Sequence, residues 1–247
     1  MIRIMRPIQS PFLSQKWGEN KACINIHNRK ITATRSGKCP SGTMNFYKAM
    51  GLKGHNGQDN GTYFREPVFF PVIADTEWKC KIEKDHDGGI GLDVFSTKPI
   101  LLKMLPPQAG EQAREQFKKW GGYMYIKLRF WHAESNLVEH GDMVKVGDLI
   151  QLSDSTGASS GNHVHWSLKF VDKEGITMDK NNGYYGAVDF TLWYENKFIL
   201  SELGLSLNLD TSQKLAKLTN ILKHFPKYGG VIPLLGSFTS LLIKIGE

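Results

Sequence analysis

The feature that most constrains the fold is a strict alternation of apolar and polar residues in two segments. Residues 123–131 read YMYIKLRFW and residues 163–170 read HVHWSLKF. Successive side chains of a β-strand point to opposite faces, so this period of two predicts strands with one buried face. Shorter runs at 78–83 and 90–95 are also expected to be strands, separated by glycine-rich turns. The sequence therefore predicts a mainly β fold with an antiparallel sheet or sandwich core.

Three parts are expected along the chain. Residues 1–43 are a lead-in that packs on the core, residues 44–200 form the main domain, and residues 201–247 form a C-terminal extension. An insertion at about 97–122 contains a helix over 111–120, flanked by prolines and glycines. The extension combines an amphipathic helix after residue 210 with an apolar stretch at 231–245, which is too short to span a bilayer. We expect this stretch to pack on its own domain or on a partner subunit, with membrane contact or particle docking as the alternative.

The charge of the chain favours an anionic partner. The formal net charge is +7, which suits nucleic acid, a membrane surface or a cell wall that carries phosphate and carboxylate groups. The basic residues are scattered and form no nucleic-acid-binding signature, so we expect no nucleic acid partner.

The cysteines do not predict a disulfide-built fold. Cys23, Cys39 and Cys80 form no CxxC pair, and an odd number in a chain of this length is unusual for a disulfide framework. We expect three partly buried free thiols, with a Cys23–Cys39 bridge as the alternative.

Histidines and one carboxylate mark three elements as a candidate metal site. The segment GHNGQD places His55 and Asp59 four residues apart in a glycine-bearing loop, and such nitrogen and oxygen ligands suit Zn²⁺. His163 and His165 point to one face of their predicted strand. Strict alternation puts His132 on the apolar face of the strand 123–131, so it reaches an open site only if that strand ends or twists there. A catalytic zinc takes three protein ligands, which leaves the other imidazoles to move protons.

At these residues the chain resembles the lysostaphin/LytM-type zinc endopeptidases, which cut bacterial peptidoglycan. The resemblance rests on GHNGQD at 54–59, FWHAES at 130–135 and VEHGDMVKVGDLIQLSDSTGASSGNHVHW at 138–166, and it covers about residues 44–170. It implies a LytM-like β fold and one zinc ion per chain, held by His55, Asp59 and His165. It also implies His163 as the general base and His132 as a group that stabilises the tetrahedral intermediate.

Several positions depart from the family pattern without removing a ligand. Asn60 follows the aspartate, Trp131 precedes the histidine, Trp166 replaces a phenylalanine, and the insertion at 97–122 is longer than usual. These departures affect the shape of the substrate groove. We predict that Tyr63, Tyr125 and Trp131 line it.

The chain is therefore interpreted as a metalloendopeptidase, a hydrolase of cross-bridge or stem-peptide bonds in peptidoglycan. The segment MNFYKAMGLKGHNGQD also resembles phage-encoded members of the family, and the N-terminal residues lack the apolar segment of a secretory signal peptide. We expect an enzyme of the virion tail or of lysis, carried in the phage particle or kept in the host cytoplasm until lysis. Other tail proteins are expected partners of the extension.

Two other functions compete with this interpretation. A catalytically inactive structural component of a phage tail would use the same fold, but the intact set of five site residues favours an enzyme. A biotinyl or lipoyl carrier domain is suggested by VEHGDMVKVGDLI, which resembles the hairpin of those domains. Lys145 lies in a strand-like alternation rather than at a tight turn, however, and a carrier function leaves the histidines unexplained.

Overall fold

The computed structural model describes residues 1–85 and 88–203. The chain divides into two compact units, Met1–Ile199 and Leu200–Glu247. Most of the predicted extension, including its helix and its apolar stretch at 231–245, lies outside the described residues. Within the described part of the chain, no helix is long and apolar enough to cross a membrane. The domain boundaries at residues 43 and 200 stay predictions.

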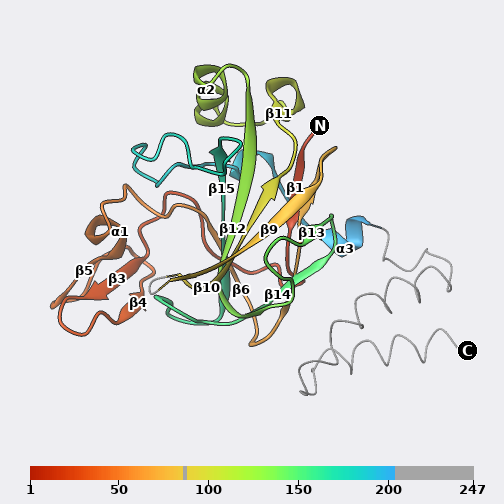
Figure 1. Ribbon diagram of the computed structural model, residues 1–247. Coiled ribbons are helices and arrows are strands. Elements are labelled where there is room, and N and C mark those ends of the chain that lie inside the picture. The colour runs from red at the N-terminus through yellow and green to blue at the C-terminus, as the bar shows by residue number, and fades with distance from the viewer. Residues whose placement is uncertain (86–87, 204–247) are drawn as a thin grey trace, which may run out of the picture. The chain divides into compact units, whose positions relative to one another are not determined.

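A large antiparallel sheet forms the centre of the first unit, as predicted. Its strands in the described residues are β2 (Leu13–Gln15), β6 (Gln58–Gly61), β7 (Pro67–Phe69), β9 (Trp78–Asp85), β10 (Gly89–Ser96), β11 (Ile100–Leu101), β12 (Tyr123–Asn136), β13 (Met143–Val144), β14 (Leu149–Ser153), β15 (His163–Val171) and β16 (Ala187–Val188). The hydrogen-bonded path runs β13-β9-β10-β12-β15-β6-β2 (Figure 1). Off this path, β11 and β14 pair with β12, β7 pairs with β14, and β16 pairs with β15.

Two smaller sheets and a few short helices complete the unit. One sheet has the order β17-β1-β8 and the other β4-β3-β5, with the bounds β1 (Arg3–Arg6), β3 (Ala22–Asn25), β4 (Ile31–Ala33), β5 (Thr43–Asn45), β8 (Val72–Ile73) and β17 (Tyr194–Phe198). The pairing of β1 with β17 is parallel. In the described residues the helices of this unit are α1 (Phe46–Ala49), η1 (Leu102–Met104), α2 (Glu111–Lys119) and η2 (Thr191–Trp193). Helix α3 (Ile199–Glu202) begins at the last residue of the unit. Helix α2 confirms the helix predicted in the insertion.

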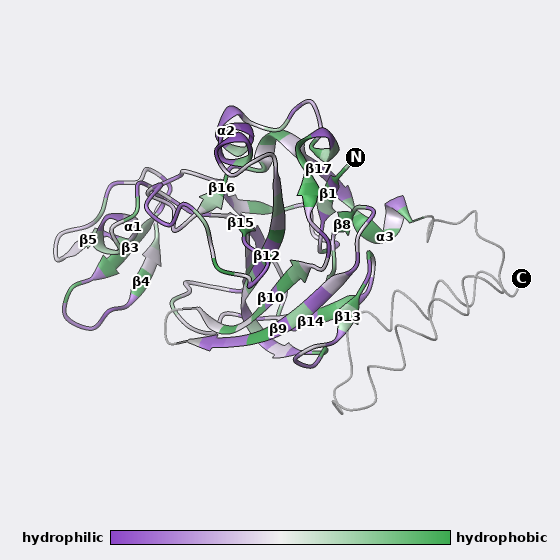
Figure 2. Cartoon of the chain, turned by 45° about the horizontal axis from the view of Figure 1, so that its top comes forward, coloured by the Kyte–Doolittle hydropathy of each residue, from purple (hydrophilic) through white to green (hydrophobic). Residues whose placement is uncertain are grey.

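The alternation of β12 and β15 separates a core from a polar face. Every second side chain of the two strands is at most 2% exposed, namely Met124, Ile126, Leu128, Phe130, Val164, Trp166, Leu168 and Phe170. Each buried side chain of this size contributes about 1.5–3 kcal/mol through the hydrophobic effect. Helix α2 covers this core: Phe117 packs edge-on against Phe170, while most of the helix is hydrophilic (Figure 2). The opposite face of the two strands is left for polar side chains.

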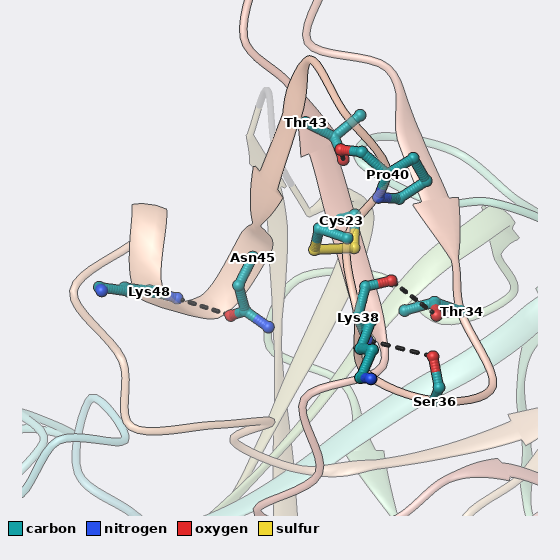
Figure 3. Close-up of a disulfide and its surroundings, with 9 residues drawn as sticks. Cys23, Thr34, Ser36, Lys38, Pro40, Thr43, Asn45 and Lys48 are labelled. Carbon is teal, nitrogen blue, oxygen red and sulfur yellow. Dashed lines mark hydrogen bonds between the residues drawn. A yellow bond between two sulfur atoms is a disulfide. The ribbon is translucent and has the colours of Figure 1, made fainter.

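The expectation of three free thiols is wrong for two of them. Cys23 on β3 forms a disulfide with Cys39, and only Cys80 is free and buried among the described cysteines (Figure 3). The small β3–β4–β5 sheet brings the two Cα atoms to 5.6 Å, within the usual range for a disulfide. A bridge across a sequence separation of 16 residues contributes about 3 kcal/mol by restricting the unfolded chain. Sequence spacing could not predict this approach, because it depends on how the small sheet pairs.

Candidate metal centre

Three side chains converge on one point at the polar face of the large sheet. The Nε2 atom of His55, the Oδ1 atom of Asp59 and the Nδ1 atom of His165 are separated by 2.9, 2.9 and 3.1 Å. The side chains are 2%, 12% and 12% exposed, respectively. These three residues form a group that could hold a metal ion. They are the three residues that the sequence motifs mark as ligands.

Strand pairing places two of the three side chains together. β6 runs antiparallel to β15, and in this register Asp59 lies directly opposite His165. The expectation that His55 and Asp59 share one loop is therefore wrong for Asp59, which is a strand residue. Directly opposed residues on one face of an antiparallel pair have Cβ atoms about 4.5–5.5 Å apart, so both side chains reach the same point.

The lead-in orients the third side chain. His55 lies in the loop before β6, and its backbone NH donates to the carbonyl of Glu19 over 3.0 Å. Its Nδ1 atom lies 3.0 Å from the carbonyl oxygen of Lys16. A carbonyl only accepts hydrogen bonds, so Nδ1 carries the proton and the Nε2 atom of neutral His55 presents a lone pair to the cluster. Outer contacts of this kind set the tautomer of metal-binding histidines.

The electrostatics of the cluster favour an ionised Asp59 and a neutral His165. Burial by itself would raise the pKa of Asp59, but His55 and His163 outweigh it and hold this pKa well below its usual range. Burial lowers the pKa of His165 to about 4. The Nε2 lone pair of His55 and the Asp59 carboxylate therefore lie 3.1 Å apart, and the Nδ1 atom of His165 lies 2.9 Å from both. A proton on Nδ1 of His165, or a metal ion in its place, can bridge these acceptors.

His132 reaches the same site through a β-bulge. In the pairing of β10 with β12, Leu92 lies opposite Phe130 but Ile90 lies opposite Ala133, so β12 has one extra residue at this point. His132 has a φ of 68°, a conformation that non-glycine residues rarely adopt. The bulge reverses the alternation, and His132 lines the same cavity as the site residues instead of entering the core. This settles the question that the sequence pattern left open.

Both remaining histidines offer a lone pair to the cavity. The Nδ1 atom of His132 lies 2.7 Å from the Thr156 carbonyl, and that of His163 lies 2.8 Å from the Gly161 carbonyl. Both Nδ1 atoms are therefore donors, which leaves both Nε2 atoms as acceptors in the neutral rings. The two rings lie side by side with centroids 4.6 Å apart. Burial, with smaller contributions from His163 and His165, lowers the pKa of His132 to about 3, so this ring is neutral near pH 7.

A cavity of about 480 Å³ opens over these residues. One wall is the polar face of β12 and β15, and the other comes from β3, β4, α1 and the segment after it, which Figure 1 shows beside the large sheet. The lead-in residues Gln15, Lys21 and Ala22 line the cavity, so the lead-in contributes to the site as well as to the fold. The residues of the cavity that the sequence reasoning did not identify include Arg129, Ser167 and Lys169. The alternation along β12 and β15 could have identified these three residues. Each of them lies on the same strand face as a predicted site residue.

The predicted groove residues lie in different places. Trp131 lines the cavity and is 8% exposed, with the Arg129 guanidinium 5.1 Å from its ring. Tyr63 and Tyr125 are not among the lining residues, and Tyr63 is 80% exposed. A role for these two tyrosines in a substrate groove stays a prediction.

Comparison with known proteins finds similarity at the level of solved structures. No family model matches the chain, and no curated protein matches it. Similar structures include the catalytic domain of the antimicrobial peptidase lysostaphin from Staphylococcus simulans, at 20% identity and a TM-score of 0.34, with 56% of this chain and 77% of that chain covered. A catalytic-domain mutant of the prophage-encoded M23 protein EnpA from Enterococcus faecalis is 17% identical, with a TM-score of 0.33 and 52% and 78% covered. A zinc-containing peptidase from Vibrio cholerae is 22% identical, with a TM-score of 0.31 and 51% and 31% covered.

These structures include the family that the sequence motifs resemble. The identities are 22% or less and the TM-scores 0.34 or less, so this similarity does not establish the chemistry of the site. The chemistry of the site is therefore the guide to function.

Proposed function

We propose that this protein is a zinc-dependent endopeptidase that hydrolyses peptide bonds in bacterial peptidoglycan. The observation that carries the proposal is the cluster of His55, Asp59 and His165, whose donor atoms lie within 3.1 Å of one another at the edge of a cavity. Beside the cluster, the lone pairs of two further imidazoles face the same space. The formal net charge of +7 suits a wall that carries phosphate and carboxylate groups.

The donor set fits zinc. Two imidazole nitrogens and one carboxylate oxygen are ordinary zinc ligands, and three protein ligands are typical of a catalytic site. A tetrahedral zinc ion with bonds of about 2.0–2.1 Å separates its donor atoms by about 3.3 Å, close to the spacing of this cluster. One zinc ion per chain is held by His55, Asp59 and His165 in this proposal. When bound, zinc acts as a Lewis acid toward a carbonyl group and lowers the pKa of water to about 7.

His163 and His132 move protons in the proposed reaction. His163 is the general base: its Nε2 atom is an acceptor and lies 3.7 Å from Asp59 Oδ1, so it can take the proton of an attacking water molecule and return it to the leaving amine. In the neutral His132 ring the Nε2 atom is an acceptor, because the Nδ1 proton is donated to the Thr156 carbonyl. It can stabilise a tetrahedral oxyanion only after it has taken up a proton.

The test separates metal binding from proton transfer. His55→Ala and Asp59→Ala should abolish stoichiometric zinc binding, measured by plasma mass spectrometry on the purified chain. His163→Ala should retain zinc and lose turnover by about 10²–10⁴-fold, the usual contribution of a general base, measured as new amino termini released from purified peptidoglycan. Loss of zinc in His163→Ala, with the fold retained, would contradict this division of roles.

Peptide release from purified cell walls with several types of cross-link distinguishes an enzyme from a structural component. A zinc-loaded protein that releases no peptide from any of them would favour the alternative, a catalytically inactive tail component with the same fold. Mass spectrometry of the released fragments would identify the bond that is cut, in a cross-bridge or in a stem peptide.

We further propose that the protein acts from a phage, either in the virion tail or after release from the host cytoplasm at lysis. The resemblance of residues 44–59 to phage-encoded family members supports this context. The extension 201–247 would then bind other tail proteins, or contact a membrane through residues 231–245. Detection of the chain in purified virions by mass spectrometry tests the virion location, and its absence there would leave release at lysis.

A further inference from the structure

The cavity continues along β15 from the metal ligands to a buried lysine. His163, His165, Ser167 and Lys169 alternate on this strand, so their side chains share one face. All four line the cavity. Lys169 is only 6% exposed. A buried ammonium group is costly unless an anion or water compensates it, so its place in the cavity calls for an explanation.

The carboxylate of Asp93, which acts on Lys169, is already paired with two other cations. Arg129 donates two hydrogen bonds of 2.7 Å to Asp93, and the Nζ atom of Lys127 lies 3.5 Å from the same carboxylate. In the described part of the chain, no hydrogen bond or ion pair joins the Lys169 ammonium group to an acidic side chain. Asp93 is therefore already paired with Arg129 and Lys127, and the Lys169 ammonium group has no such partner among the described residues.

Among the described lining residues, the lack of an acidic partner distinguishes Lys169 from the other lysine. The other lysine that lines the cavity, Lys21, is paired with Glu19 at 2.8 Å. Burial, assisted by the positive charges of Arg129 and Lys127, lowers the pKa of Lys169 to about 7. An anion beside Lys169 would reverse this effect, because an opposite charge favours the protonated form.

The distance from the metal cluster suits a substrate that lies along the sheet. His165 and Lys169 are four residues apart on one strand, which corresponds to about 13 Å between their Cα atoms. An extended peptide advances about 3.3 Å per residue. A carboxylate within about four residues of the scissile bond can therefore reach Lys169 while the bond lies at the metal cluster.

We propose that Lys169, with Arg129 beside it, forms a subsite that binds a free carboxylate of the substrate peptide on one side of the scissile bond. Hydrogen bonds between a cation and a carboxylate are the stronger kind in proteins, and this one would form in a largely buried place. The inference rests on the proposed peptidase function and narrows it. Under this proposal the enzyme prefers stem peptides, which carry free carboxylates, to an uncharged glycine cross-bridge as substrates.

The test compares two substrates with the zinc-loaded full-length chain. One is a synthetic pair of directly cross-linked stem tetrapeptides with free carboxyl groups, and the other has every carboxyl group converted to a primary amide. Wild type should favour the acid by about tenfold or more, mainly through KM, as expected for a hydrogen bond between charged groups. Lys169→Met should remove this preference, and Lys169→Arg should keep it. Lys173→Met changes a lysine whose side chain is 76% exposed and serves as the matched control, with the wild-type preference.

The outcomes separate this subsite from the peptidase proposal. Lys169→Met is expected to fold, because it removes a buried positive charge that lies opposite Lys127, and its melting temperature checks this. If wild type cuts walls but treats the acid and the amide alike, or if Lys169→Met keeps the preference, the subsite is absent and the peptidase stands. If nothing is cut, the peptidase proposal fails, and the subsite is then tested by calorimetry, which measures the binding of both peptides to His163→Ala. Tighter binding of the acid that is lost on adding Lys169→Met supports it, and equal binding of the two peptides overturns it.

Discussion

Gly57 offers a sharp test of how the metal cluster is assembled. It lies between two of the proposed ligands in sequence and touches the third in space. A Cβ atom added at this position would lie 2.5 Å from the Trp166 carbonyl oxygen and 2.7 Å from Cε1 of His165. Gly57 is not among the glycines with a positive φ, so its backbone is open to alanine and the only obstacle to Gly57→Ala is steric.

The size of the effect follows from what can move. The Trp166 carbonyl belongs to β15 and cannot retreat without disturbing the central sheet, so the His165 ring must shift. Overpacking of this kind costs about 1–3 kcal/mol. The reduced freedom of the unfolded chain offsets up to about 1 kcal/mol of this. Each kcal/mol shifts the melting temperature of a domain of this size by about 2–4 °C, so a net cost of up to about 3 kcal/mol should lower the melting temperature of metal-free Gly57→Ala by up to about 12 °C. The displaced ligand should also weaken zinc binding by about 10–100-fold.

The assay is a thermal melt in chelator, followed by a zinc titration against a chromophoric chelator. Gly161→Ala is the matched control, since Gly161 lies two residues before His163, has no positive φ, and an added Cβ atom meets nothing within 4 Å. This variant should melt and bind zinc like wild type. The reasoning is refuted if Gly57→Ala keeps both the melting temperature and the zinc affinity of wild type, or if Gly161→Ala loses as much.

Three further predictions concern stability. Asp93→Ala should lower the free energy of unfolding, measured in urea, by about 3 kcal/mol, because it removes the buried carboxylate that pairs with Lys127 and Arg129. A decrease of less than about 1 kcal/mol would contradict this. Chelation should lower the melting temperature of the zinc-loaded chain by roughly 5–10 °C, since a ligand at 100 times its Kd stabilises the fold by about 2.7 kcal/mol, and an unchanged value argues against a metal site. In the metal-free chain, burial lowers the pKa of His165 to about 4 and that of His132 to about 3, below the ordinary 6.5. The unfolded state therefore takes up protons first as the pH falls, and the urea midpoint should decrease from about pH 6.5 toward pH 4, whereas a flat profile would contradict the buried neutral histidines.

Local alternation was sufficient to predict one strand of the site in detail. In residues 163–170 the period of two assigns Val164 and Trp166 to the core and His163 and His165 to the other face, and the structure confirms both assignments. The same pattern places Lys169 on the polar face, although the sequence alone could not show that it is buried with no acidic partner among the described residues. The direction of a side chain in a strand is a local property, which is why it can be read from a short segment.

Other features of the site depend on contacts between distant segments. The bulge that turns His132 into the cavity arises from the register between β10 and β12, which local pattern does not specify. The proton on Nδ1 of His55 is assigned by the Lys16 carbonyl, 39 residues earlier in the chain. Cys23 and Cys39 meet because a small sheet folds back on itself.

The sequence by itself determined the strands, the faces of their side chains and the residue types available as candidate ligands, because these follow from local periodicity and chemistry. Only the tertiary structure decided which of those side chains share one cavity, which ring nitrogens carry a proton, and which buried lysine has no acidic partner in the described part of the chain. Those properties come from the pairing of strands and loops far apart in the chain, and no short stretch of sequence contains them.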